Sequence, residues 1–130
     1  MLDARATVET FVEAFGEGRL DDALGLLHEE FVVHAAGSVP YSGDYQGVEG
    51  FRNLIAKMLP LLKLAPSPEM GYLVDGDNVV LYYRLTFTAR ASGKSVEMPV
   101  TEVFTVRNGL ITDLDVFYKN PSAVTALMSA

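Results

Sequence analysis

The stretch from Val96 to Asn120, VEMPVTEVFTVRNGLITDLDVFYKN, decides the fold. It predicts two long β-strands joined at Asn108-Gly109, because this dipeptide readily supplies the two positive-φ residues of a type I′ turn. A two-residue turn fixes the register, so residues whose numbers sum to 217 face each other. Since side chains alternate along a strand, one face of the hairpin is the more apolar, and we expect it to be buried. That face holds Met98, Val100, Glu102, Phe104, Val106, Ile111, Asp113, Asp115 and Phe117.

This register places the carboxylates of Glu102 and Asp115 directly opposite each other, an arrangement that destabilises a sheet. If both line a dry cavity, the pKa of one should be raised, because two adjacent carboxylates resist double ionisation. A protonated carboxyl beside an ionised one is suited to enolisation, aldol cyclisation or epoxide opening. The alternative is that this face lies outward, for example at a dimer contact, where Arg84, Lys119 or an arginine of a partner neutralises the pair.

The composition excludes several classes of function. The 130 residues carry a net charge of −7, which disfavours nucleic acid and anionic membranes as partners. There is no cysteine, so disulfides, thiolate nucleophiles and zinc–sulfur sites are absent. The two histidines lie far apart, and no metal or cofactor is expected. We expect one domain over residues 1–130, without a signal peptide or membrane span, and a cytoplasmic location.

The first half of the chain predicts helices around one short strand. Apolar residues repeat with helical spacing from Asp3 to Phe15, and a short helix is expected to begin near Asp21. A strand over Phe31–Ala35 is followed by a glycine-rich loop over Gly37–Gly50. Helical spacing resumes at Phe51 and ends before Pro60. Aromatic loops rich in turn residues often border a binding site.

The second half predicts strands. A linker over residues 65–69 leads into a strand over residues 72–75 and a longer one over residues 79–90. Ser92-Gly93 then predicts a second two-residue turn, which would place Tyr83 beside Glu102. We therefore expect an α+β fold in which a curved antiparallel sheet wraps around N-terminal helices and forms a cone-shaped pocket.

Three stretches resemble a known superfamily: FVVHAAG with SGDYQGVEGF, then MPVTEVFTVRNGLI, and finally DVFYKNPSAV. With this order of elements, the whole chain resembles the SnoaL-like branch of the nuclear transport factor 2-like superfamily, which has a cystatin-like fold and includes ketosteroid isomerase and limonene epoxide hydrolase. The resemblance implies the fold but not one reaction, since members include isomerases, cyclases, hydrolases and non-catalytic binders.

The family's working residues match this chain only in part. The tyrosine that ketosteroid isomerases carry on their first helix matches Phe11, and their general-base aspartate falls at His34-Ala35-Ala36. Their protonated aspartate, a known case of carboxyl pKa tuning, matches Glu102, or Thr101 without a gap. The aspartate on the last strand of SnoaL-type cyclases and epoxide hydrolases matches Asp115, or Val116 without a gap. The predicted register favours Glu102 and Asp115, and ketosteroid isomerisation is not supported.

Three residues are the candidate catalytic groups. Asp115 would act as the base, Glu102 as its protonated or orienting partner, and His34 as an auxiliary acid or base. His34 is equally well interpreted as a strand-end histidine bonded to a backbone carbonyl, and Tyr83 either donates a hydrogen bond to an oxyanion or belongs to the core. Candidate substrate-binding residues share aromatic or thioether side chains: Tyr83, Tyr41, Tyr45, Phe11, Phe15, Met58, Met98, Phe104 and Phe117.

Two functions follow from these residues. The first is a cofactor-independent isomerase, cyclase or epoxide hydrolase that acts on a small apolar carbonyl or epoxide compound. The alternative is a non-catalytic ligand-binding or dimerisation module of the same fold, with its pocket filled by side chains. A homodimer is expected in either case, because the other face of the hairpin, with Val103, Leu114, Val116 and Tyr118, is apolar enough to need covering.

Overall fold

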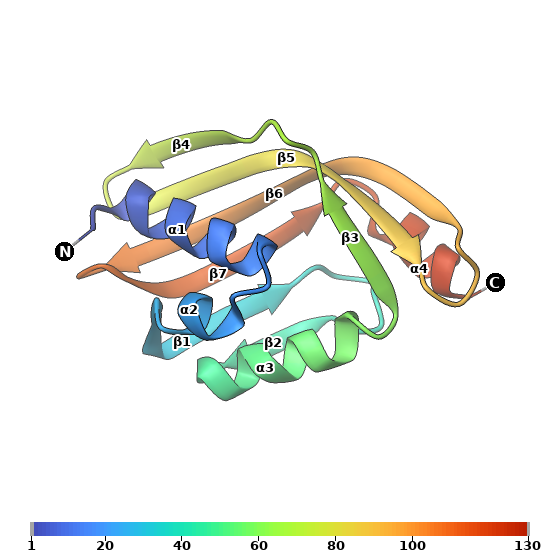
Figure 1. Ribbon diagram of the computed structural model, residues 1–130, viewed down its shortest axis with the longest axis horizontal. Helices are drawn as coiled ribbons and strands as arrows, with labels where there is room; N and C mark the ends of the chain where they lie inside the picture. The colour runs from blue at the N-terminus through green and yellow to red at the C-terminus, as the bar shows by residue number, and fades with distance from the viewer. Residues whose placement is uncertain (1, 130) are drawn as a thin grey trace.

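The computed structural model describes residues 2–129, in which four helices lie against one strongly curved sheet (Figure 1). The predicted α+β fold with a curved sheet is confirmed. In chain order the elements are α1 (Ala4–Gly16), α2 (Leu20–Leu24), β1 (Leu27–Ala35), β2 (Gly43–Gln46), α3 (Gly47–Met58), β3 (Leu62–Pro66), β4 (Gly71–Asp75), β5 (Asn78–Ala89), β6 (Ser95–Arg107), β7 (Leu110–Tyr118) and α4 (Pro121–Met128).

The strands are joined in the order β2-β1-β7-β6-β5-β3, and β4 pairs with the first part of β5. Neighbouring strands are antiparallel except β1 and β7, which are parallel. In Figure 1 the long strands β5, β6 and β7 form the back of the fold, and α1, α2 and α3 lie on its concave side. β3 crosses the far end of this concave side.

The turn between β6 and β7 has the predicted geometry. Asn108 and Gly109 both have positive φ, 52° and 76°, as a type I′ turn requires. Beyond it, however, the strands do not stay in the predicted register. Val106 pairs with Ile111, but the next pair is Thr105 with Asp113, so one residue of β7 is extra, as in a β-bulge.

This bulge reverses which side chains of β7 face inward. Glu102 pairs with Val116, and Asp115 pairs with Val103 on the opposite face of the sheet. The predicted opposition of Glu102 and Asp115 is therefore wrong. The inner face of β6 is as predicted, whereas the inward side chains of the later part of β7 are Leu114, Val116 and Tyr118 instead of Asp113, Asp115 and Phe117.

The turn between β5 and β6 is also longer than expected. Thr88 pairs with Ser95, and the backbone N–H of Ala89 donates to the carbonyl of Lys94 (2.9 Å). As a result Leu81, and not Tyr83, pairs with Glu102. Because the register changes by two residues, Tyr83 still points to the same face as Glu102.

The core lies between the helices and the inner sheet face. Asp3 caps α1 by accepting a hydrogen bond from the N–H of Ala6 (2.7 Å). The apolar side of α1 then packs Phe11 against Phe51 of α3 and Phe104 of β6, with ring centroids 5.9 and 6.0 Å apart. These aromatic contacts hold two helices on the sheet.

Several boundaries differ from the sequence prediction. The glycine-rich loop contains β2, and α3 begins at Gly47 instead of Phe51. Residues 65 and 66, predicted to start a linker, belong to β3. Among residues 2–129 no helix is long and apolar enough to cross a membrane. The cytoplasmic location stays a prediction.

Candidate active site

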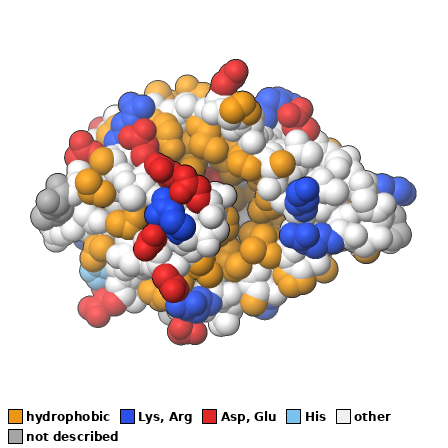
Figure 2. All heavy atoms as spheres, viewed as in Figure 1, with side chains coloured by type: hydrophobic (Ala, Val, Ile, Leu, Met, Phe, Trp, Pro, Cys, Tyr) orange, Lys and Arg blue, Asp and Glu red, His pale blue; other side chains and the backbone are white. Residues whose placement is uncertain are grey.

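A cavity of about 600 Å³ lies between the helices and the inner face of the sheet. Figure 2 shows its opening as a hollow bordered largely by hydrophobic side chains. Such a volume is in the range of small-molecule sites. The lining residues are Phe11, Val12, Phe15, Gly16, Gly18, Leu20, Val33, Ala35, Ala36, Tyr41, Phe51, Leu54, Ile55, Met58, Leu59, Lys63, Leu64, Pro66, Met70, Leu81, Tyr83, Leu85, Arg90, Glu102, Leu114, Val116 and Tyr118.

Glu102 is the one acidic residue among the described residues that line this cavity. It lies on β6, between Leu81 of β5 and Val116 of β7, so apolar side chains flank it on both neighbouring strands. Its Oε2 accepts a hydrogen bond from the hydroxyl of Tyr83. Burial raises the pKa of Glu102, and the hydrogen bond from Tyr83 lowers it by a smaller amount.

Two tyrosines occupy the row of side chains next to Glu102. Tyr83 and Tyr118 both pair with Val100, one from each side, and both line the cavity. Burial is the main cause that raises the pKa of each tyrosine, and the nearby Glu102 carboxylate raises it further. Both hydroxyls therefore keep their protons near neutral pH and are available as hydrogen-bond donors.

Tyr118 forms a second polar pair in the same cavity. Its hydroxyl lies 2.9 Å from that of Tyr41, and either oxygen can be the donor. Tyr41 is fixed by its fully packed ring and by Tyr45, whose hydroxyl donates to the Tyr41 carbonyl (2.8 Å). Since a hydrogen bond between two hydroxyls uses one proton, the other proton is free to bind an oxygen atom in the cavity.

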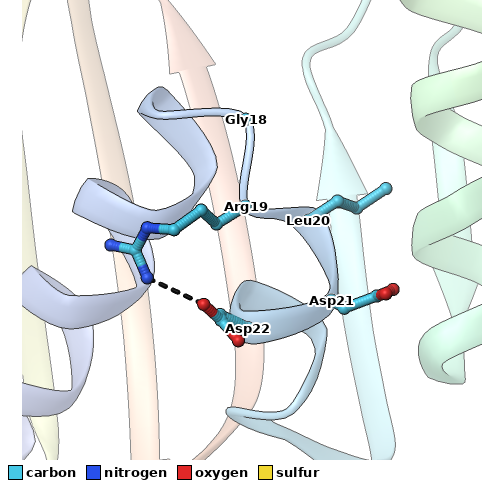
Figure 3. A pocket seen from close by; sticks show the side chains of 5 residues that line it. All are labelled: Gly18, Arg19, Leu20, Asp21 and Asp22. Carbon is cyan, nitrogen blue, oxygen red and sulfur yellow. Dashed lines mark hydrogen bonds and ion pairs between the residues drawn. The ribbon is translucent and has the colours of Figure 1, made fainter.

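The turn between α1 and α2 forms a second, shallow depression, shown in Figure 3. Arg19 closes it by pairing with Asp22 (2.8 Å) and with Glu17 (2.9 Å). Leu20 points away from the Arg19–Asp22 ion pair, and Gly18 and Leu20 also line the main cavity. We interpret this turn as part of the cavity entrance, because Gly18 and Leu20 line the cavity while the charged side chains of the turn are exposed.

Metal-binding side chains do not gather in the described part of the chain. Residues 2–129 contain no group of three or more His, Cys, Asp or Glu that could hold a metal ion. Besides the basic residues Lys63 and Arg90, the ionisable side chains that line the cavity are one carboxyl, which can transfer a proton, and three tyrosine hydroxyls, which can form hydrogen bonds.

Comparison with known proteins agrees with this architecture. The model of the SnoaL-like domain matches residues 8–114, which is most of the chain. The chain belongs to the SnoaL-like domain family. Among curated proteins no sequence matches it significantly.

Solved structures share the fold of this SnoaL-like domain at low sequence identity. An NTF2-like protein from Burkholderia xenovorans is 18% identical with a TM-score of 0.87, over 96% of this chain and 95% of that one. A "putative polyketide cyclase" from Xanthomonas campestris is 19% identical with a TM-score of 0.82, over 95% and 96%. TerC, co-crystallised with polyporic acid, is 17% identical with a TM-score of 0.85, over 98% of both chains.

Six of the predicted site residues line the SnoaL-like cavity: Glu102, Tyr83, Tyr41, Phe11, Phe15 and Met58. They come from α1, the loop before β2, α3, β5 and β6. Their convergence agrees with the prediction that helices and curved sheet enclose a pocket. Their roles toward a substrate stay predictions.

The other two candidate catalytic residues lie outside the cavity. Asp115 is on the outer sheet face because of the bulge in β7. His34 is next to it on β1, between Asp115 and Asp44, and its Nδ1 lies 2.7 Å from Oδ1 of Asp44. The prediction that Asp115 and His34 act with Glu102 in one pocket is wrong in its geometry. Neither interpretation of His34 included its actual partner, a carboxylate.

Four predicted substrate-binding residues also lie elsewhere. Tyr45 supports the loop behind Tyr41, and Phe104 packs in the core against Phe11. The Met98 sulfur accepts a hydrogen bond from the Asn120 N–H (3.4 Å), and Phe117 is 52% exposed on the outer face. Phe117 points outward for the same reason as Asp115.

The sequence analysis missed three polar lining residues. Tyr118 was assigned to the outer face, because the bulge was not predicted. Lys63 lies on β3 and Arg90 follows the last residue of β5, and neither had a pattern that indicated a site. The available signal for Tyr118 was the gapless match to the family, which favours Val116, and so Tyr118, on the inner face.

Proposed function

We propose that this SnoaL-like domain binds a small apolar compound with a carbonyl group and that Glu102 moves a proton on a carbon next to that group. The observation that carries this proposal is the Glu102–Tyr83 pair in a largely apolar cavity of about 600 Å³. Burial raises the pKa of this carboxyl, which makes its ionised form a stronger base than an exposed glutamate.

The reaction needs only groups that line the cavity. Ionised Glu102 takes a proton from the carbon next to the carbonyl, and the electron pair of the broken C–H bond moves onto the carbonyl oxygen. A hydroxyl of the Tyr41–Tyr118 pair donates a hydrogen bond to the resulting enolate. If the substrate is a β,γ-unsaturated carbonyl compound, the enolate is a dienolate, and Glu102 returns the proton to its γ carbon while the carbonyl re-forms, which gives the α,β-unsaturated isomer. In a cyclisation the enolate instead attacks a second carbonyl of the same molecule, and the proton goes to the new alkoxide.

This proposal differs from the sequence prediction in using one carboxyl. Asp115 was predicted to be the base, but its side chain lies on the outer face of the sheet, and the sheet separates it from the cavity. We therefore favour reactions in which the same group takes and returns the proton over epoxide hydrolysis, which needs separate groups for the water and the epoxide oxygen.

The structural neighbours support the ligand class. TerC was co-crystallised with polyporic acid, and the Xanthomonas protein is named for polyketide cyclisation. For the present chain, cyclisation of a carbonyl compound is one outcome of the proton transfer that we assign to Glu102. The cavity also argues against the predicted alternative of a module whose pocket is filled by side chains.

The test is exchange of carbon-bound hydrogen for deuterium in apolar ketones such as 2-tetralone and 4-phenyl-2-butanone, followed by NMR in heavy water. We expect the protein to accelerate exchange next to the carbonyl, and Glu102→Gln to reduce this rate by about 10²–10⁴-fold. Glu97→Gln is the matched control, because Glu97 lies on the same strand but pairs with exposed Arg84 on the outer face. Ligands that raise the melting temperature without any exchange would indicate a non-catalytic binding protein.

We further propose that the domain forms a homodimer through its outer sheet face. Tyr82 and Phe117 are 49% and 52% exposed and flank Thr101 in one row across β5, β6 and β7, with Val80 and Val103 in the next row. Exposed apolar groups of this kind tend to be covered by a partner. Of the residues that first suggested a dimer, only Val103 lies on this face.

The test is the molecular mass in solution by light scattering after size-exclusion chromatography. We expect a dimer for the unmodified protein and a monomer for Phe117→Lys. Leu2→Lys, which adds the same charge at an exposed position before α1 and outside the sheet, should leave the dimer intact. A monomeric wild-type protein at high micromolar concentration would contradict the proposal.

A further inference from the structure

The cavity has two basic residues at one side of its lining, Lys63 on β3 and Arg90 directly after β5. Both side chains are exposed, and Lys63 alternates along β3 with the inward-facing Leu62 and Leu64, so both cations lie at the edge of the cavity rather than in its interior. In Figure 2 basic side chains gather over β3 beside the hollow, and acidic ones gather on the opposite side, over the α1–α2 turn. The opening therefore has a basic and an acidic side.

The basic side is not neutralised by the protein. Among residues 2–129 neither Lys63 nor Arg90 has an acidic partner within salt-bridge distance, whereas Arg19 on the other side pairs with both Glu17 and Asp22. Although the chain has a net charge of −7, these two cations give one side of the opening a positive potential, which attracts an anionic ligand.

Arg90 is also held in a fixed position. Its Nε donates to the carbonyl of Leu59 (2.6 Å), and its backbone N–H donates to the carbonyl of Leu61 (3.0 Å). Only one of the five guanidinium N–H groups is used in this way, so the remaining donors can bind both oxygens of a carboxylate. Leu59 itself lines the cavity, which places the guanidinium at the edge of the binding space.

Glu102 is at a different part of the cavity wall. Leu81, its partner on β5, is the fourth of the 12 residues of that strand, whereas Arg90 follows the last residue, Ala89. A ligand can therefore place an anionic end at the opening without bringing it against the buried carboxyl. Its apolar body would then extend toward Glu102 and Tyr83.

We propose that the natural ligand of the cavity is an apolar molecule with a carboxylate, and that Arg90 and Lys63 bind this carboxylate at the opening. This inference rests on the proposed function only in that a ligand occupies the cavity. It names the ligand class, and it holds whether or not Glu102 performs chemistry.

The test compares 1-naphthylacetate with 1-naphthylacetamide, which have the same apolar ring but differ in charge, by isothermal titration calorimetry. We expect the protein to bind the carboxylate roughly tenfold more tightly or better, since hydrogen bonds to charged groups contribute more than neutral ones. Arg90→Gln should weaken binding of the carboxylate by a similar factor and leave the amide unchanged. Lys63→Gln should reduce the preference less, because lysine offers no bidentate contact.

Arg107→Gln is the matched control, because Arg107 is an exposed cation at the β6–β7 turn without an acidic partner among the described residues and does not line the cavity. Glu102→Gln should keep the preference for the carboxylate, which separates this inference from the proton-transfer proposal. Equal affinity for the two compounds, or no binding of either, would overturn it. The inference would also be overturned if Arg90→Gln weakened binding of the carboxylate and of the amide equally. That result would indicate that Arg90 has a purely structural role at the end of α3.

Discussion

The Tyr83 hydroxyl donates a hydrogen bond to Oε2 of Glu102, although the two residues are not paired across β5 and β6. Tyr83 reaches Glu102 from the neighbouring row of side chains on the inner face. A single donor of this kind does not offset the loss of water around the carboxylate, so the pKa of Glu102 stays raised. The pair thus places a carboxyl with a raised pKa in contact with the cavity.

The pH dependence of proton exchange should report this balance. Because the ionised form of Glu102 is the proposed base, the exchange rate should rise with pH through its raised pKa and then level off. Tyr83→Phe removes the one hydrogen bond that lowers this pKa, so the midpoint of the profile should move to higher pH. Rates measured by NMR at a series of pH values test this, and an unchanged midpoint in Tyr83→Phe would contradict the assignment.

Burial of Glu102 should also make the folded protein less stable at higher pH. Its pKa is higher in the folded than in the unfolded state, so the folded state binds the proton more tightly. This contribution to stability is complete below the unfolded pKa, roughly 4.3, and is lost as pH rises through the folded pKa. Glu102→Gln should therefore melt at a higher temperature than wild type near pH 8, with a smaller difference near pH 4. A Gln variant that is less stable near pH 8 would argue against a buried, ionisable Glu102.

Asp115→Asn should leave proton exchange unchanged within about twofold, because Asp115 lies on the outer sheet face and is not among the residues that line the cavity. This expectation is the opposite of the one that follows from the sequence. Measured beside Glu102→Gln in the same ketone assay, it decides between the two assignments. A loss of exchange in Asp115→Asn comparable to that in Glu102→Gln would restore Asp115 as the base.

The reason for this reversal is local and small. Asn108-Gly109 specifies the turn correctly, and the alternation along β6 predicts its inner face, including Glu102. One extra residue in β7, between Ile111 and Asp113, then moves every later side chain of that strand to the other face. Nothing in the residue types there requires a bulge, since Thr112 suits a regular strand equally well.

Other parts of the site depend on contacts that hydrophobic patterns do not encode. The apolar stripes of α1 and α3 predict which side of each helix is buried, and Phe11, Phe15 and Met58 line the cavity accordingly. Lys63 and Arg90 reach the opening because β3 pairs with the end of β5, a long-range pairing that the short, proline-containing β3 segment does not indicate. Lys63 and Arg90 can therefore be assigned to the cavity opening only once the order of the strands in the sheet is known.

The packing of α3 against β2 supplies a prediction about stability. A Cβ atom at Gly50 would lie 2.8 Å from the backbone carbonyl carbon of Tyr45, closer than such atoms approach without a shift of the backbone. Gly50→Ala should destabilise the protein by about 1–3 kcal/mol, as expected for overpacking. Gly37→Ala is the control, because a Cβ there has open space around it. Denaturant unfolding of both variants tests the difference, and equal stability would show that α3 can move away from β2 at little cost.

His34 on the outer face should make stability depend on pH in the neutral range. The hydrogen bond with Asp44 is the largest cause that raises the pKa of His34, and the charges of Asp44, Asp115 and Asp113 add to it. A raised histidine pKa stabilises the fold fully below the unfolded value, about 6.5, and this stabilisation is lost as pH rises through the folded value. The effect should be small, because the His34 side chain is 40% exposed and water screens the pair.

Asp44→Asn should flatten the decrease in melting temperature between about pH 6 and pH 8, since it removes both the hydrogen-bonded charge and its attraction for the imidazolium. Asp113→Asn is the matched control, because its charge is the smallest contribution to the His34 pKa and should change the slope least. Melting curves recorded at fixed ionic strength separate the two variants. If the slope is the same in wild type and Asp44→Asn, His34 does not keep its proton through Asp44. In that case the row of Asp44, His34 and Asp115 across the outer face is part of the proposed dimer surface but does not make the melting temperature depend on pH.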